Sequence, residues 1–93
     1  MQNPQATLVT ESFTLMKKLG FSELADAFQR SLTNRLPYNI LIHIAIFLRE
    51  YFSQTQVEPL FQQIGASRHL SHLYEHNYKY NNKRFLLALG NWR

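Results

Sequence analysis

Three histidines in the C-terminal third have the spacing that comes nearest to a chemical site. His69, His72 and His76 are three and four positions apart, so a helix would carry all three imidazoles on one face. Imidazoles placed in this way can bind a divalent metal such as zinc. However, a single helix seldom arranges three ligands well around one ion, and the sequence offers no obvious fourth ligand. We therefore predict no metal site and no cofactor, and expect these histidines to contact phosphates or a partner.

Residues suited to catalysis are sparse. The chain has no cysteine, which excludes thiol chemistry, disulfides and cysteine-bound zinc. Asp26 is the only aspartate, and the three glycines are isolated, so neither a serine nucleophile elbow nor a glycine-rich phosphate loop is present. Two histidine–carboxylate pairs, His43 with Glu50 and His72 with Glu75, could each share a helix face, but neither has a third member. We predict that the protein is not an enzyme.

The positive charge is concentrated at one end of the chain. Residues 1–65 carry five basic and five acidic residues, whereas residues 66–93 carry five basic residues against Glu75 alone. The whole formal net charge of +4 therefore belongs to the C-terminal third. A basic end on a neutral body either attracts an anionic partner or helps to keep a small protein soluble.

Aromatic and basic residues are interleaved along residues 76–85. Such a segment suits nucleic-acid binding, because rings stack on bases while lysines and arginines meet phosphates. The alternative is that apolar side chains of the C-terminal end close the core. We expect this core role of Phe85 and Trp92, and leave both roles open for Tyr78 and Tyr80. The residues that we predict to bind nucleic acid are Arg68, His69, His72, Lys79, Lys83, Arg84 and Arg93.

The elements that must position these residues are helices. Apolar residues recur with the 3.6-residue period of a helix almost throughout, and no stretch alternates cleanly with period two. We predict an all-α fold: a single compact domain, residues 1–93, of five or six short helices packed around a central apolar helix, with a basic C-terminal third at 66–93. The expected helices are about 5–19, 22–34, 39–53, 55–65, 68–78 and 83–89. The expected stops are Gly20, Gly65 and Gly90, and the expected N-caps are Ser22, Thr55 and Ser67.

The helix expected at about 39–53 is apolar around most of its circumference. Its polar positions, among them His43 and Glu50, fall on one narrow side. A helix of this kind must be covered by neighbouring helices or by another chain. We expect a central core helix, and keep as the alternative that part of its face binds a partner or a second copy.

Residues 60–74 resemble the turn and recognition helix of the AraC-type regulators. Gly65 permits the turn, Ser67 can cap the next helix, and that helix is basic and carries leucines. The resemblance implies a helix that enters the major groove of DNA. The sequence departs from the pattern in two ways, because the turn is one residue short and Phe61 stands where alanine is common.

A second segment, residues 15–28 with the helix that reaches Glu50, is similar to the N-terminal helical region of the IstB-like transposition helper ATPases. The ATPase core and its phosphate loop have no counterpart in this sequence. This resemblance therefore implies only an adaptor or assembly role.

Two functional hypotheses follow from these patterns. The first is a small non-enzymatic protein, a nucleic-acid-binding or regulatory module that uses the basic C-terminal helical region. The alternative is a protein–protein interaction adaptor or inhibitor that binds a partner, or itself, through the apolar third helix. We also expect a homo-oligomer, no membrane association and a cytoplasmic location, because the sequence has no apolar run near 20 residues and no signal-peptide pattern.

Overall fold

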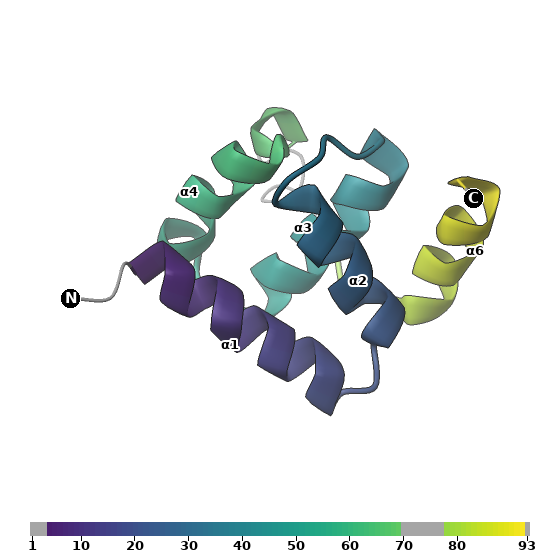
Figure 1. Ribbon diagram of the computed structural model, residues 1–93, viewed down its shortest axis with the longest axis horizontal. Coiled ribbons are helices and arrows are strands. Elements are labelled where there is room, and N and C mark those ends of the chain that lie inside the picture. Colours follow the sequence, from purple (N-terminus) through teal and green to yellow (C-terminus); the bar gives the residue numbers. More distant parts are fainter. Residues whose placement is uncertain (1–3, 70–77, 93) are drawn as a thin grey trace.

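The computed structural model describes residues 4–69 and 78–92, which form five α-helices and one 3-10 helix and contain no strand (Figure 1). In chain order these are α1 (Pro4–Lys18), α2 (Ser22–Ser31), α3 (Tyr38–Tyr51), α4 (Gln54–Ile64), the 3-10 helix η1 (Ser67–His69) and α6 (Asn82–Trp92). The all-α prediction is confirmed. The helix expected at about 68–78 lies mostly outside the described residues, and the part that is described belongs to η1.

Helix α3 is the centre of the fold. It packs against α2, α4 and α6, while α1 packs against α2 and α4. In Figure 1, α4 and α6 lie on opposite sides of α3, and α1 runs along the lower edge of the view. The buried residues of α3 are Ile40, Leu41, Ile44, Ala45, Phe47 and Leu48. Burial of this broad apolar face confirms the prediction of a central core helix.

Two of the predicted glycine stops are confirmed. Gly20 follows α1 with a φ of +85°, and Gly65 follows α4 with a φ of +83°. Side chains other than glycine are strained in this left-handed region, which is why glycine ends these helices. After α4, the N–H of Gly65 donates to the carbonyl of Gln62 and the N–H of Ala66 donates to that of Phe61. These bonds satisfy carbonyls that the end of the helix leaves without partners.

Two of the predicted N-caps are wrong. Helix α2 begins at Ser22 itself, with Phe21 in the cap position and no side-chain cap bond. Helix α4 is capped by Ser53, whose Oγ accepts the N–H of Gln56 at 3.3 Å, while Oε1 of Gln56 accepts the N–H of Ser53 at 3.0 Å. The predicted box at Thr55 lies two residues later. Ser-x-x-Gln satisfies the same pattern as Thr-x-x-Glu, and α3 ends early enough for the first of the two to form.

Helices α2 and α6 end elsewhere than predicted. Helix α2 ends at Ser31 instead of near Asn34, and the chain turns after it, with the N–H of Asn34 donating to the carbonyl of Arg30 at 2.8 Å. Helix α6 continues through Gly90 to Trp92. A glycine inside a helix costs about 1 kcal/mol relative to alanine. The packing of Trp92 against the core, with the Arg30 guanidinium 5.9 Å from the ring centroid, offsets this cost.

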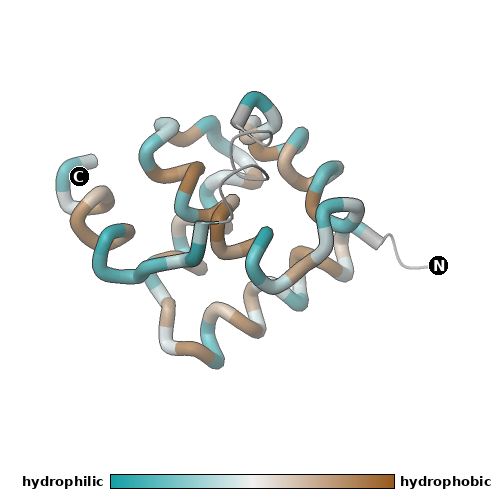
Figure 2. The backbone as a smooth tube through the Cα atoms, turned by 180° about the vertical axis from the view of Figure 1, so that it is seen from behind, coloured by the Kyte–Doolittle hydropathy of each residue, from teal (hydrophilic) through white to brown (hydrophobic). Residues whose placement is uncertain are grey.

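Helix α6 turns one side toward α3 and the other toward solvent. Phe85 is fully buried and Leu89 is 4% exposed, and Trp92 packs partly buried against the same core. The core-closing role predicted for Phe85 and Trp92 is thus confirmed. Figure 2 shows that the segment leading into α6 is hydrophilic and that the middle of the helix is hydrophobic. The basic residues therefore lie just before α6 and in its first turn.

Candidate nucleic-acid interface

Three predicted site residues lie in the first turn of α6 or just before it. Asn81 caps the helix: its Oδ1 accepts the N–H of Arg84 at 3.3 Å, and its carbonyl accepts the N–H of Phe85 at 3.1 Å. Lys83 and Arg84 therefore occupy the second and third positions of the first turn, and Lys79 precedes the cap by two residues. We call Lys79, Lys83 and Arg84 the basic cluster.

The electrostatic setting of the basic cluster is unusual for a helix. The first turn of α6 contains no acidic residue, although the N-terminus of a helix carries about half a positive charge and favours acidic side chains. All three side chains of the cluster are exposed. None of them makes an ion pair with another residue in the described ranges. Two cations and the positive end of the helix dipole thus reinforce one another at this point.

Tyr80 fixes the start of α6 to the rest of the domain. Its ring lies 5.0 Å from that of Phe21 and 5.4 Å from that of Phe47, measured between centroids. Its hydroxyl donates to Oδ1 of Asn82 at 2.7 Å, and its backbone N–H donates to Oε2 of Glu50 at 3.0 Å. Tyr80 precedes the cap residue Asn81 and bonds to Asn82, which follows it. Because the Tyr80 ring packs on α3 and on the start of α2, it holds the basic cluster to those helices. Glu50, which the sequence offered only as a weak catalytic candidate, has this anchoring role.

Burial keeps the Tyr80 phenol in its neutral form. Desolvation, and secondly the negative charge of Glu23, raise the pKa of Tyr80 well above its usual value of 10. The hydroxyl consequently remains a donor to Asn82 across the physiological range. Of the two tyrosines whose roles were left open by the sequence, Tyr80 is half-buried and Tyr78 is 46% exposed.

His43 borders the basic cluster from α3. Its ring meets that of Phe85 edge-on, with centroids 5.7 Å apart. Burial, and secondly the positive charge of Arg84, lower the pKa of His43 below its ordinary value of 6.5. His43 is therefore neutral at neutral pH, and it adds no charge to the cluster.

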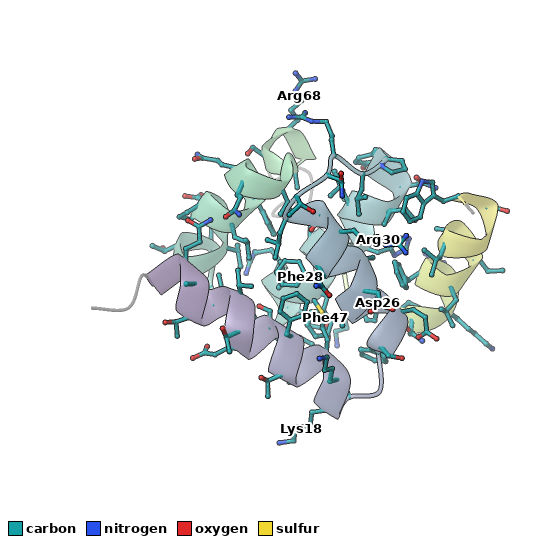
Figure 3. All side chains as sticks on the ribbon, in the orientation of Figure 1. Lys18, Asp26, Phe28, Arg30, Phe47 and Arg68 are labelled. Atoms are coloured by element: carbon teal, nitrogen blue, oxygen red, sulfur yellow. The ribbon has the colours of Figure 1, made fainter. Side chains whose placement is uncertain are left out.

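The remaining predicted residues are not joined to the basic cluster. Arg68 is exposed in η1, beyond the end of α4 and away from α6 (Figure 3). The backbone of His69 belongs to η1, whereas its side chain lies outside the description. His72 and Arg93 also lie outside the described residues, as does His76.

Arg35 is a cation at the turn after α4 that the sequence did not single out. An ideal Cβ built on Gly65 would lie 3.6 Å from the guanidinium carbon of Arg35, so this side chain covers the turn that ends α4. A cation at the C-terminus of a helix is favourable, and Arg35 therefore has a structural reason for its position. No local spacing in the sequence relates residue 35 to residue 65, so only the tertiary fold brings them together.

The other chemical candidates are weak among the described residues. No group of three or more histidine, aspartate or glutamate side chains there is placed to hold a metal ion. A hollow of about 560 Å³ lies between α1 and α4, but Glu11 is the only titratable one among the described residues that line it. None of the described helices combines the length and apolar character that a bilayer span requires.

Comparisons with protein-family models, with curated proteins and with solved structures find no match to this chain. The resemblance of residues 60–74 to the AraC-type regulators and that of residues 15–28 to the IstB-like ATPases thus gain no support from them.

Proposed function

We propose that the protein binds nucleic acid through the basic cluster of Lys79, Lys83 and Arg84. The observation that carries the proposal is the placement of Lys83 and Arg84 in the first turn of α6, without an acidic residue to balance them. Each cation at this end of a helix opposes the dipole by about 0.3–1 kcal/mol. A bound phosphate would reverse the sign of that interaction, because helix N-termini and cations both attract anions.

The form of the cluster favours a polyanion over a single phosphate. The three cations are spread along six residues that include a helix cap, and all three side chains are exposed. Tyr78, which adjoins Lys79 and is 46% exposed, offers a ring on which a base can stack. A chain of phosphates with bases between them satisfies both features. The protein would act by binding, without catalysis.

The core position of α3 weakens the alternative hypothesis that a protein partner binds to that helix. Its buried side chains are already covered by its neighbours. On the described part of α3, the large hydrophobic side chains that stay exposed are Tyr38 at 48% and Tyr51 at 46%. This alternative therefore has less apolar surface to use than the sequence suggested, and it stays a prediction.

The test compares two double variants that remove the same charge. Lys83→Ala/Arg84→Ala removes two cations of the basic cluster, and Lys17→Ala/Lys18→Ala removes two from the last turn of α1, where Lys18 lies at the far end of that helix from α4 (Figure 3). Binding is measured by fluorescence anisotropy of labelled single- and double-stranded DNA and RNA at about 50 mM salt. Each lost phosphate contact weakens binding by about tenfold under these conditions.

We expect the α6 variant to lose about two orders of magnitude in affinity, and the α1 variant to stay within a few-fold of the wild type. Equal losses in the two variants would mean that only the net charge matters. An unchanged affinity in the α6 variant would remove the cluster from the binding site. Either result contradicts the proposal.

A further inference from the structure

The solvent side of α6 carries exposed leucines. Phe85 and Leu89 are buried against the core, so Leu87, which lies between them in the sequence, points away from it. Leu87 is 71% exposed and Leu86 is 40% exposed. Leu87 has the highest exposure of the large hydrophobic residues in the described ranges. We call Leu86, Leu87 and Gly90 the outer face of α6.

Gly90 extends this outer face as a flat surface one turn further along the helix. An ideal Cβ built on Gly90 would meet no atom within 4 Å, and Gly90 lies inside α6. The fold of the chain therefore has no steric need for glycine here, although glycine is among the weakest helix formers. A position without a side chain beside Leu86 and Leu87 does allow another backbone to approach closely.

The basic residues beside the outer face indicate the charge of a partner that would bind there. Lys83 and Arg84 precede Leu87 by four and three residues, so they lie one turn before it on the same side of the helix. The sequence contains no acidic residue after Glu75. The surface is thus apolar in the middle and basic at one end. Its complement is a helix with an apolar stripe flanked by acidic residues.

We infer that the outer face of α6 docks an acidic amphipathic α-helix of a protein partner. A second copy of this chain fits less well, because its own α6 contains no acidic residue to pair with Lys83 and Arg84 and its net charge is +4. The docked helix would cover Lys83 and Arg84, and would therefore compete with nucleic acid for two of the three cations of the basic cluster. That regulatory consequence rests on the proposed function, whereas the docking itself does not.

The probe is a fluorescent 18-residue helical peptide with leucines on one face and glutamates beside them, compared with the same peptide carrying lysine in place of glutamate. We expect the acidic peptide to bind, and the lysine version to bind at least about tenfold more weakly. Leu87→Ser should weaken binding of the acidic peptide by about tenfold, because the variant lacks the leucine side chain that the docked peptide would bury. The control is Leu19→Ser, which changes a leucine that is 41% exposed at the end of α1 and should leave binding unchanged.

Gly90→Gln separates docking from folding. Glutamine is a better helix former than glycine and its Cβ meets open space, so the variant should melt at a higher temperature than the wild type. The added side chain should nevertheless weaken binding of the acidic peptide, because it stands where the partner backbone approaches. A higher melting temperature with unchanged peptide binding would overturn the role of Gly90 and with it the docking geometry.

Three further outcomes would overturn the inference: no binding of the acidic peptide, equal binding of both peptides, or equal effects of Leu87→Ser and Leu19→Ser. If light scattering shows a wild-type dimer that Leu87→Ser dissociates, the outer face binds a second copy instead.

A competition experiment adds labelled nucleic acid to the protein and the acidic peptide. If the acidic peptide binds but nucleic acid does not, the proposed function fails while the docking surface stands; if both bind and the peptide displaces the nucleic acid, both hold.

Discussion

Removing the two cations from the first turn of α6 should make the domain more stable. Lys83 and Arg84 are exposed, they stand at the positive end of the helix dipole, and they have no acidic residue beside them in that turn. Each opposes the dipole by about 0.3–1 kcal/mol, and alanine is also a slightly better helix former. Lys83→Ala/Arg84→Ala should therefore raise the free energy of unfolding by about 1 kcal/mol. For a domain of this size, that corresponds to an increase in Tm of about 4–8 °C.

The matched control should move stability in the opposite direction. Lys17 and Lys18 lie in the last turn of α1, where cations are favourable, so Lys17→Ala/Lys18→Ala should lower the free energy of unfolding by a few tenths to about 1 kcal/mol. Thermal and urea unfolding followed by circular dichroism at low salt measures both variants. A destabilised α6 variant would show that these cations serve the fold. Their position would then have a structural cause, contrary to a binding role.

Three other perturbations test the described packing. Phe85→Ala should lower the free energy of unfolding by about 3–5 kcal/mol in urea denaturation, because the side chain is fully buried, while Leu87→Ala should change it by less than about 0.5 kcal/mol. The pKa of His43 is lower in the folded than in the unfolded protein, so the unfolded chain binds a proton first, and stability should fall as pH drops from about 6.5 toward the folded-state pKa. His43→Gln should reduce this loss between pH 7.5 and 5, and an equal loss in the variant would contradict the assignment. Gly65→Ala should destabilise by about 1 kcal/mol because of its positive φ, whereas Gly90→Ala should stabilise by about 0.5–1 kcal/mol; equal thermal shifts would contradict both conformations.

The helices and most of the core follow from the periodicity of the sequence. The apolar stripe of α3 and the glycines at 20 and 65 are local signals, and they suffice to find the central helix and two of the turns. The choice between two overlapping capping patterns at Ser53 and Thr55 is not local, since it depends on where α3 ends. The continuation of α6 past Gly90 is not local either, because the contact between Trp92 and Arg30 joins it to α2.

The candidate site follows from the sequence only in part. The basic character of residues 79–84 is plain from their types, and the structure places Lys83 and Arg84 in the first turn of α6 with Lys79 two residues before its cap. Arg68 belongs to the same basic C-terminal third of the sequence, yet it lies beyond the end of α4 and away from α6 (Figure 3). The anchoring of the cluster by Tyr80 between Phe21 and Phe47 depends on rings from three parts of the chain. Such contacts leave no pattern in the segment itself.

The salt dependence of nucleic-acid binding by the wild-type protein tests the central claim most directly. Affinity for labelled duplex and single-stranded oligonucleotides is measured by anisotropy between about 50 and 200 mM salt. If the three cations of the basic cluster each meet a phosphate, the logarithm of the affinity should fall with the logarithm of the salt concentration with a slope of about −2 to −3. No binding at the lower salt concentration, or binding that does not change with salt, would contradict a phosphate-binding role for Lys79, Lys83 and Arg84.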